Sequence, residues 1–152
     1  GGPELLDEVT ALPNRVLLLR ELEREVARCS RTARLFSLLT VRVLELRAYA
    51  AAAGLACAEE LMAGLGSLLL RQVRTMDVAG IYGADVFLAV LSEAPDGRSA
   101  VVRLRQALGA LPQYREARRV VSSLGLELKE VAYPRDGATV DDLLRALQLE
   151  PS

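Results

Sequence analysis

The amino-acid sequence predicts an α/β fold of the α+β type, in which helices flank one central mixed sheet. Segments with the apolar spacing of helices alternate with short apolar runs of strand length. A hairpin pattern lies near the middle of the chain. The chain has 152 residues, of which 51% are hydrophobic, so it can bury a core of ordinary size. We therefore expect a single domain over residues 1–152.

The first half of the chain predicts a helix, a strand and a second helix. Residues 14–31 carry apolar side chains every three or four positions with charged residues between them, and Asn14 is the expected N-cap. Residues 36–46 are rich in leucine and valine and predict a buried strand, although Arg42 lies in its middle. Residues 49–71 are rich in alanine and leucine and predict one long helix, softened by three glycines.

The middle of the chain predicts a hairpin followed by a helix. Residues 78–82 and 86–91 are short apolar runs on either side of Gly83-Ala84-Asp85, which is a hairpin pattern. A helix is expected over residues 99–111, after a Pro-Asp-Gly loop signal. Residues 113–119 carry three arginines and are expected to form a polar connection.

The last part of the chain predicts a strand, a turn and a helix. Residues 120–131 alternate enough between apolar and polar side chains to form a strand, and residues 133–137 (YPRDG) predict a turn. Thr139 and Asp142 resemble a capping box that opens a helix over residues 140–147. The expected order is helix, strand, helix, hairpin, helix, strand, helix.

Composition excludes several classes of function. The sequence has no histidine, which removes histidine general bases, Ser-His and Cys-His pairs and histidine-ligated zinc. Nineteen basic residues against twenty acidic residues leave a formal net charge of -1, which argues against a basic nucleic-acid surface. We therefore expect no nucleic-acid partner.

The chain is expected to be cytoplasmic and to make no membrane contact. Cys29 and Cys57 form no CxxC pair and are too few for a disulfide framework, so a reducing compartment fits best. Charged residues interrupt every apolar stretch well before the ~20 residues that a membrane span requires. The start of the chain lacks the basic segment and apolar core of a signal peptide, and residues 1–6 are interpreted as a linker or a cloning remnant.

Three segments, in order along the chain, resemble the GGDEF domain of bacterial diguanylate cyclases, which join two GTP molecules into cyclic di-GMP. Residues 7–15 (DEVTALPNR) resemble the family's opening D-x-LTGLPNR, and residues 121–126 (VSSLGL) resemble its VSIG strand. Residues 133–137 match its YPxDG turn. The resemblance implies a central sheet with a ferredoxin-like core and flanking helices.

The signature hairpin departs from the family pattern. It reads Gly83-Ala84-Asp85-Val86-Phe87 where an active member carries GG[DE]EF. In the family, the position of Val86 holds an acidic residue assigned to metal binding and to activation of the attacking hydroxyl, and valine can do neither. Ala84 replaces the glycine that lets the nucleotide approach the backbone. The resemblance therefore implies a degenerate site.

Further positions of the family's active site are also changed. Counted from Gly54, the strand aspartate that would hold magnesium falls on Arg42, and the Asn-Asp pair that reads guanine falls on Ala50 and Ala51. Of the metal-binding set only Asp85 remains, so we expect no catalysis, no metal and no cofactor. Two readings of Arg42 stay open: it reaches solvent along its apolar stem, or its guanidinium occupies the former metal position and pairs with Asp85.

A product-binding motif of the family has a counterpart at Arg74 and Asp77, which form an RxxD tetrad with five residues before Gly83. In the family this tetrad is an inhibitory site for cyclic di-GMP, often completed by an arginine of the following helix, here Arg103. A guanidinium can donate to guanine O6 and N7, and a carboxylate can accept from N1–H and N2–H. The competing reading is that Arg74 and Asp77 cap a helix and pair on the surface.

These residues predict a catalytically inactive GGDEF domain that acts as a cyclic di-GMP receptor through Arg74, Asp77 and Arg103 and regulates other domains of a longer signalling protein or a partner protein. The alternative is a protein-interaction or dimerisation module that binds no ligand. A homodimer is compatible with either reading.

Overall fold

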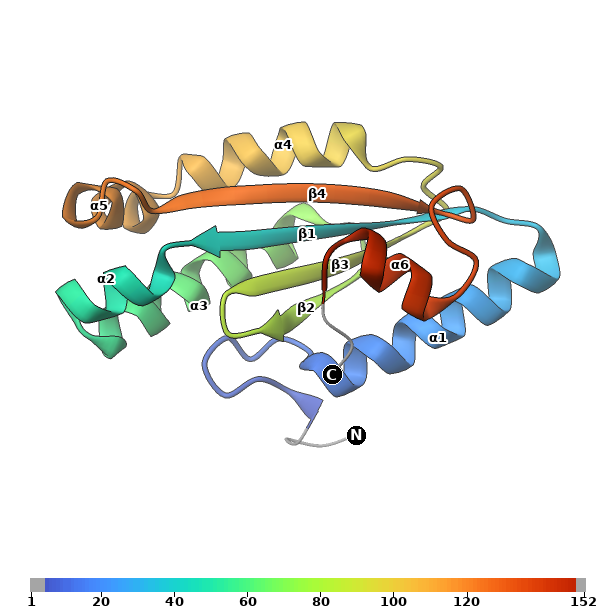
Figure 1. Ribbon diagram of the computed structural model, residues 1–152, viewed down its shortest axis with the longest axis horizontal. Helices are drawn as coiled ribbons and strands as arrows, with labels where there is room; N and C mark the ends of the chain where they lie inside the picture. Colours follow the sequence, from blue (N-terminus) through green and yellow to red (C-terminus); the bar gives the residue numbers. More distant parts are fainter. Residues whose placement is uncertain (1–4, 150–152) are drawn as a thin grey trace.

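The computed structural model describes residues 5–149, which form a four-stranded sheet with helices on both faces (Figure 1). The strands are β1 (Phe36–Leu44), β2 (Val78–Gly83), β3 (Val86–Ser92) and β4 (Gly125–Tyr133). Their order across the sheet is β2-β3-β1-β4, and all three pairings are antiparallel. The α+β class and the ferredoxin-like arrangement of the core are confirmed.

The expectation of a mixed sheet is wrong. The helical crossover after β1 leads to β2, and these two strands run in the same direction, as in a parallel unit. However, β3 turns back after the hairpin and lies between them, so no two parallel strands are neighbours. The alternation of helices and strands predicts one sheet covered by helices, but the position of the hairpin strand β3 decides which strands pair.

Two helical layers bury two separate cores. The helices are α1 (Arg15–Thr32), α2 (Leu46–Ala53), α3 (Leu55–Gln72), α4 (Arg98–Gly109), α5 (Pro112–Val120) and α6 (Val140–Ala146). Helices α2 to α5 cover the face that carries Leu39 and Val41, whereas α1 and α6 cover the face that carries Phe36 and Leu38 (Figure 1). No helix in residues 5–149 is both long enough and apolar enough to cross a membrane.

The predicted long helix over residues 49–71 is wrong, because the chain forms two helices that meet at Gly54. This glycine has φ 101°, a conformation that favours glycine over every other residue. It ends α2 with its N–H bonded to the Ala50 carbonyl oxygen and also precedes the first residue of α3. Helix α2 begins at Leu46, before the predicted start, and β1 ends at Leu44.

The predicted polar connection over residues 113–119 is also wrong, because these residues belong to helix α5. Pro112 occupies its first turn, where the missing N–H has no consequence. Tyr114 and Ala117, three positions apart, are buried against the core, and the arginines lie on the exposed side. Since α5 continues to Val120, the last strand begins at Gly125 and not at the predicted position.

Both N-caps predicted from the sequence are confirmed. The Asn14 side chain accepts a hydrogen bond from the Leu17 N–H at 3.1 Å and caps α1. The Thr139 side chain accepts from the Asp142 N–H at 3.1 Å and caps α6.

The loop before α1 packs tightly on the edge of β2 at Gly80. The Ile81 N–H donates to the Pro13 carbonyl oxygen at 2.9 Å, and a Cβ added at Gly80 would lie 2.3 Å from that oxygen.

Replacement of Gly80 with alanine should therefore lower the free energy of unfolding by about 1–2 kcal/mol, because the loop backbone must move away. Urea unfolding measures this change. Gly109→Ala is the matched control, since nothing lies within 4 Å of its added Cβ, and an equal loss there would contradict the argument.

Candidate functional site

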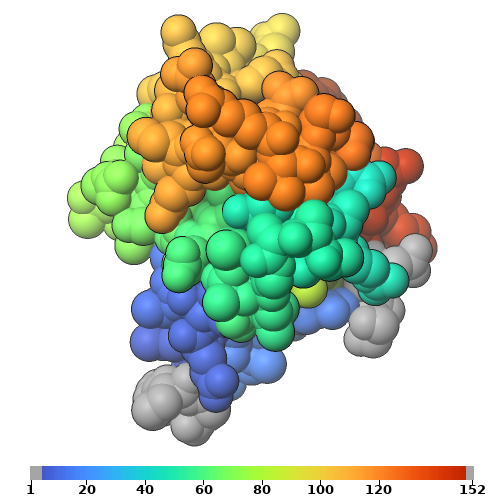
Figure 2. Space-filling model, turned by 90° about the vertical axis from the view of Figure 1, so that its left-hand side faces the viewer, coloured from blue at the N-terminus to red at the C-terminus, as the bar shows by residue number. Residues whose placement is uncertain are grey.

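A cavity of about 700 Å³ lies beside the β2–β3 hairpin. The loop before α1, helices α2 and α3, and the hairpin residues 81–85 form its walls. In Figure 2 the blue N-terminal loop and the green α2–α3 region lie one above the other, and the yellow-green hairpin is visible between them. Most of the wall side chains are apolar, among them Val9, Leu55 and Met62. This volume is within the range of small-molecule sites.

Arg42 and Asp85 form an ion pair close to this cavity. Nη1 of Arg42, near the end of β1, lies 3.2 Å from Oδ1 of Asp85 in the hairpin turn. The Val43 N–H donates to the Asp85 carbonyl oxygen at 2.8 Å, which holds the turn against β1. In the sheet register Arg42 lies between Val86 on β3 and Glu127 on β4. The ion pair expected in one of the two readings of Arg42 is therefore present, with both side chains partly exposed.

The remaining positions singled out at the signature hairpin and on α2 do not form one cluster. Val86 is 3% exposed and packs into the core beneath α1 and α6. Gly83, Ala84 and Ala50 line the cavity. Ala51 is exposed and is not part of the cavity wall. The structure thus places a buried methyl-bearing side chain, and no oxygen ligand, at residue 86.

Sequence reasoning missed two charged residues of the cavity wall, Arg47 on α2 and Glu59 on α3. Both are exposed, and neither side chain forms a hydrogen bond or ion pair with any residue in the described part of the chain. Helical spacing could have indicated Arg47, because it lies one turn before Ala50, a position that the family resemblance singles out. No sequence signal indicates Glu59. Across the cavity, the Arg15 guanidinium lies 4.4 Å from the centre of the Tyr82 ring.

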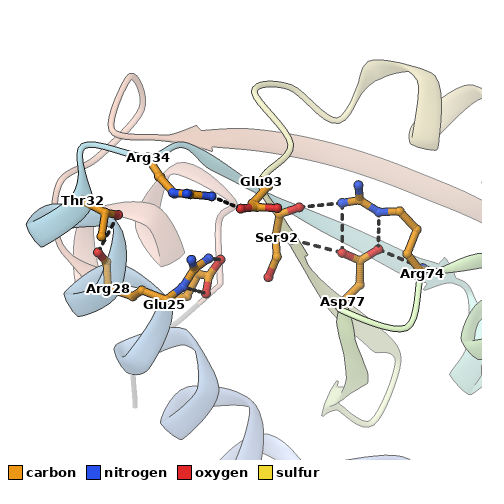
Figure 3. A network of polar contacts seen from close by, with 8 residues as sticks. All are labelled: Glu25, Arg28, Thr32, Arg34, Arg74, Asp77, Ser92 and Glu93. Carbon is orange, nitrogen blue, oxygen red and sulfur yellow. Dashed lines mark hydrogen bonds and ion pairs between the residues drawn. The ribbon is translucent and has the colours of Figure 1, made fainter.

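The Arg74–Asp77 tetrad lies in the short connection between α3 and β2, next to the end of β3 (Figure 3). Nε and Nη2 of Arg74 each donate to the Asp77 carboxylate at 3.1 Å, and the Arg74 backbone N–H donates to it at 2.9 Å. The Ser92 N–H donates to the same carboxylate at 3.0 Å. Nη2 of Arg74 also donates to the Ser92 carbonyl oxygen at 2.6 Å. These bonds fasten the tetrad to β3.

The two members of the tetrad differ in exposure. The Asp77 side chain is 2% exposed and accepts four hydrogen bonds, which is about the full capacity of a carboxylate. The Arg74 side chain is 49% exposed, and its hydrogen bond to Asp77 raises the pKa of the guanidinium above its usual value. Asp77 therefore holds Arg74 in one orientation and has no free lone pair for a ligand in this arrangement.

Arg103 of α4 points back toward the same end of α3. Its Nη2 donates to the Gln72 carbonyl oxygen at 3.2 Å, two residues before Arg74 in the chain. The fold thus brings both arginines to the end of α3, each bonded to a backbone carbonyl. Figure 3 also shows that Glu93, which follows Ser92, pairs with Arg34 after α1.

In active members of the family, acidic residues at the hairpin and on the first strand would hold magnesium, and the residues at those positions here can be compared with that role. In residues 5–149 no group of three or more acidic, cysteine or histidine side chains lies close enough together to hold a metal ion. At the hairpin the Asp85 carboxylate faces a guanidinium, and Val86 has no oxygen. The residues present do not fit a divalent cation.

Comparison with protein-family models identifies one family over almost the whole chain. Residues 4–148 match the family model described as diguanylate cyclase, GGDEF domain. No curated protein sequence matches the chain.

Many solved structures share the fold. The FimX GGDEF domain from Pseudomonas aeruginosa has a TM-score of 0.81 at 18% identity, covering 95% of this chain and 89% of that one. A sensory box/GGDEF protein from Caulobacter crescentus has 0.77 at 20%, covering 95% and 93%. The GGDEF domain of DgcB from Caulobacter crescentus, solved in complex with c-di-GMP, has 0.72 at 14%, covering 95% and 86%. At these identities the likeness shows the fold alone.

Proposed function

The chain belongs to the family of diguanylate cyclase GGDEF domains, and on that basis we propose that it is a catalytically inactive member that binds cyclic di-GMP and regulates an attached domain or a partner protein. Two parts of the structure support this proposal, namely the Arg42–Asp85 ion pair and the arginines at the end of α3.

The Arg42–Asp85 pair is the observation that carries the inactive half of the proposal. Phosphoryl transfer between nucleotides requires metal ions that neutralise the phosphate charge, and carboxylates hold those ions. Here a guanidinium lies 3.2 Å from the one acidic residue kept from the signature. A positive charge at this place repels a divalent cation and takes up the carboxylate oxygen that would bind it.

Arg74 and Arg103 support the binding half. Arg74 is half exposed and is held in place by Asp77, so its remaining donors are oriented before any ligand arrives. A guanidinium recognises the O6 and N7 acceptors of guanine, and further arginines balance the two phosphates of the dinucleotide. The DgcB GGDEF domain, which has this fold, was solved with c-di-GMP. In this proposal Asp77 positions Arg74 and does not read the base.

Calorimetric titration with cyclic di-GMP tests the binding half. The domain should bind, and Arg74→Ala should weaken binding at least about tenfold, because a charge-assisted contact to the base is lost. Arg119→Ala is the matched control, since Arg119 is an exposed arginine on α5 whose one ion pair within residues 5–149 is with Glu116. No heat at about 50 μM protein, or equal affinity of the Arg74→Ala variant, would retire the receptor role.

One observation favours a second candidate, a protein-interaction module that binds no ligand. The Asp77 carboxylate is fully engaged within the chain, and both arginines already donate to backbone carbonyl oxygens. A ligand would have to replace these bonds. If this candidate is correct, association with a partner is unchanged by saturating cyclic di-GMP.

A further inference from the structure

The two outer strands of the sheet, β2 and β4, differ in what lies along their outer edges. At the edge of β2, the Ile81 N–H is bonded to the Pro13 carbonyl oxygen, so the loop before α1 closes that side. Strand β4 is the other outer strand and pairs with β1 on one side only. An outer strand with free N–H and C=O groups is a template for pairing with another strand.

The turn after β4 shows which of its residues face outward. The Ala132 N–H donates to the Asp136 carboxylate, and the Ala132 carbonyl oxygen accepts from the Asp136 N–H, both at 2.8 Å. Ala132 therefore directs its backbone groups away from β1. Because the direction alternates along a strand, Leu126, Leu128 and Glu130 also direct theirs outward. The outward backbone groups of Leu126, Leu128 and Glu130 have no hydrogen-bond partner in residues 5–149.

We propose that this edge pairs with β4 of a second copy of the chain, in an antiparallel register centred on Leu128. In this register the two Leu128 residues exchange hydrogen bonds with each other, and Leu126 exchanges them with Glu130 of the second copy. A two-fold axis relates the two chains, so one patch meets its own copy and the dimer closes. The outward groups of both edges are then satisfied.

The side chains on β4 select this register. Glu127 and Lys129 lie on the same face of the strand, with Nζ and Oε1 3.7 Å apart. With the axis at Leu128, Glu127 faces Lys129 of the other copy in both halves, at a non-hydrogen-bonded pair where side chains approach most closely. An axis at residue 127 or 129 would set two glutamates or two lysines directly opposite each other, which is unfavourable.

Both charged side chains are available for this contact. Glu127 is 43% exposed and Lys129 34% exposed. Lys129 also donates to the Gln148 side chain after α6, which keeps it on this face of the sheet. A lone lysine on an edge discourages pairing, but a lysine and a glutamate two positions apart complement a second copy of themselves.

Sedimentation equilibrium in the absence of nucleotide tests the proposal. The wild-type domain should dimerise, and Lys129→Glu should raise the dimer Kd at least about tenfold, because it sets Glu127 opposite a second glutamate. The double variant Glu127→Lys with Lys129→Glu restores opposite charges and should return the Kd toward the wild-type value. Circular dichroism checks that each variant is folded.

A second measurement on the wild-type chain does not depend on any variant. Exchange of the amide protons of Leu126, Leu128 and Glu130 should slow as protein concentration rises, while that of exposed loop amides should not. A monomer at all concentrations up to about 0.5 mM overturns the proposal. A dimer whose Kd is the same for Lys129→Glu and for the double variant overturns it as well. Because cyclic di-GMP is absent, neither result bears on the receptor role.

Discussion

Replacement of Asp77 with alanine is expected to lower the free energy of unfolding by about 3 kcal/mol. The carboxylate is 2% exposed and joins the start of β2 to the end of β3. Its removal leaves the Ser92 N–H without its acceptor and frees the Arg74 guanidinium. Arg74 is half exposed, so water can solvate the released charge, and the loss stays below that of a fully buried pair. Equilibrium unfolding in urea measures the change.

A surface pair provides the control for this prediction. Glu116 and Arg119 lie one turn apart on α5 and are both more than 70% exposed, so Glu116→Ala should change the stability by no more than about 1 kcal/mol. Similar losses for Asp77→Ala and Glu116→Ala would mean that the Asp77 carboxylate does not hold the two strands together. Such a result would also remove its assigned role in orienting Arg74.

Arg42→Asp is expected to create a response to divalent cations that the wild-type domain lacks. The new carboxylate at residue 42 would lie next to Asp85 and opposite Glu127 in the sheet register. Three acidic side chains would then lie together where the wild type has one arginine and two acids. Without metal the variant should be less stable, because the acids repel one another. At a Mn²⁺ concentration about 100 times the Kd, binding adds about 2.7 kcal/mol, which raises Tm by several degrees.

Arg42→Asn separates the two possible causes of such a response. It removes the ion pair with Asp85 without adding a carboxylate, so its Tm should not depend on Mn²⁺. Thermal unfolding of the three proteins with and without Mn²⁺ decides the question. Equal stabilisation of wild type and Arg42→Asp would show that the guanidinium does not keep cations away.

Most of the framework could be predicted from the sequence because it depends on local patterns. The hairpin around Gly83, the N-caps at Asn14 and Thr139 and the strand that carries Arg42 are visible as turn residues, capping residues and apolar runs. Gly54 is one of the three glycines that soften the predicted helix over residues 49–71, but the break at Gly54 depends on its φ of 101°. A glycine tolerated inside a helix has the same sequence signal.

The site could be predicted only in part, because its chemistry depends on contacts between distant segments. The RxxD pattern predicts that Asp77 reads a base, and it does not show that the Ser92 N–H, fifteen residues later on β3, donates one of the four hydrogen bonds to the Asp77 carboxylate. No local pattern reveals that contact. Because residues 113–119 are mostly polar, their composition predicts a loop. The helix depends instead on Tyr114 and Ala117, three positions apart, which pack α5 against the core.

The most direct test of the account is incubation of the domain with GTP and Mg²⁺, followed by phosphorus NMR for pyrophosphate and chromatography for cyclic di-GMP. The ion pair between Arg42 and Asp85 predicts that GTP remains unchanged over hours. Formation of both products, with loss of that activity in Asp85→Asn, would contradict the central claim that this hairpin no longer supports phosphoryl transfer.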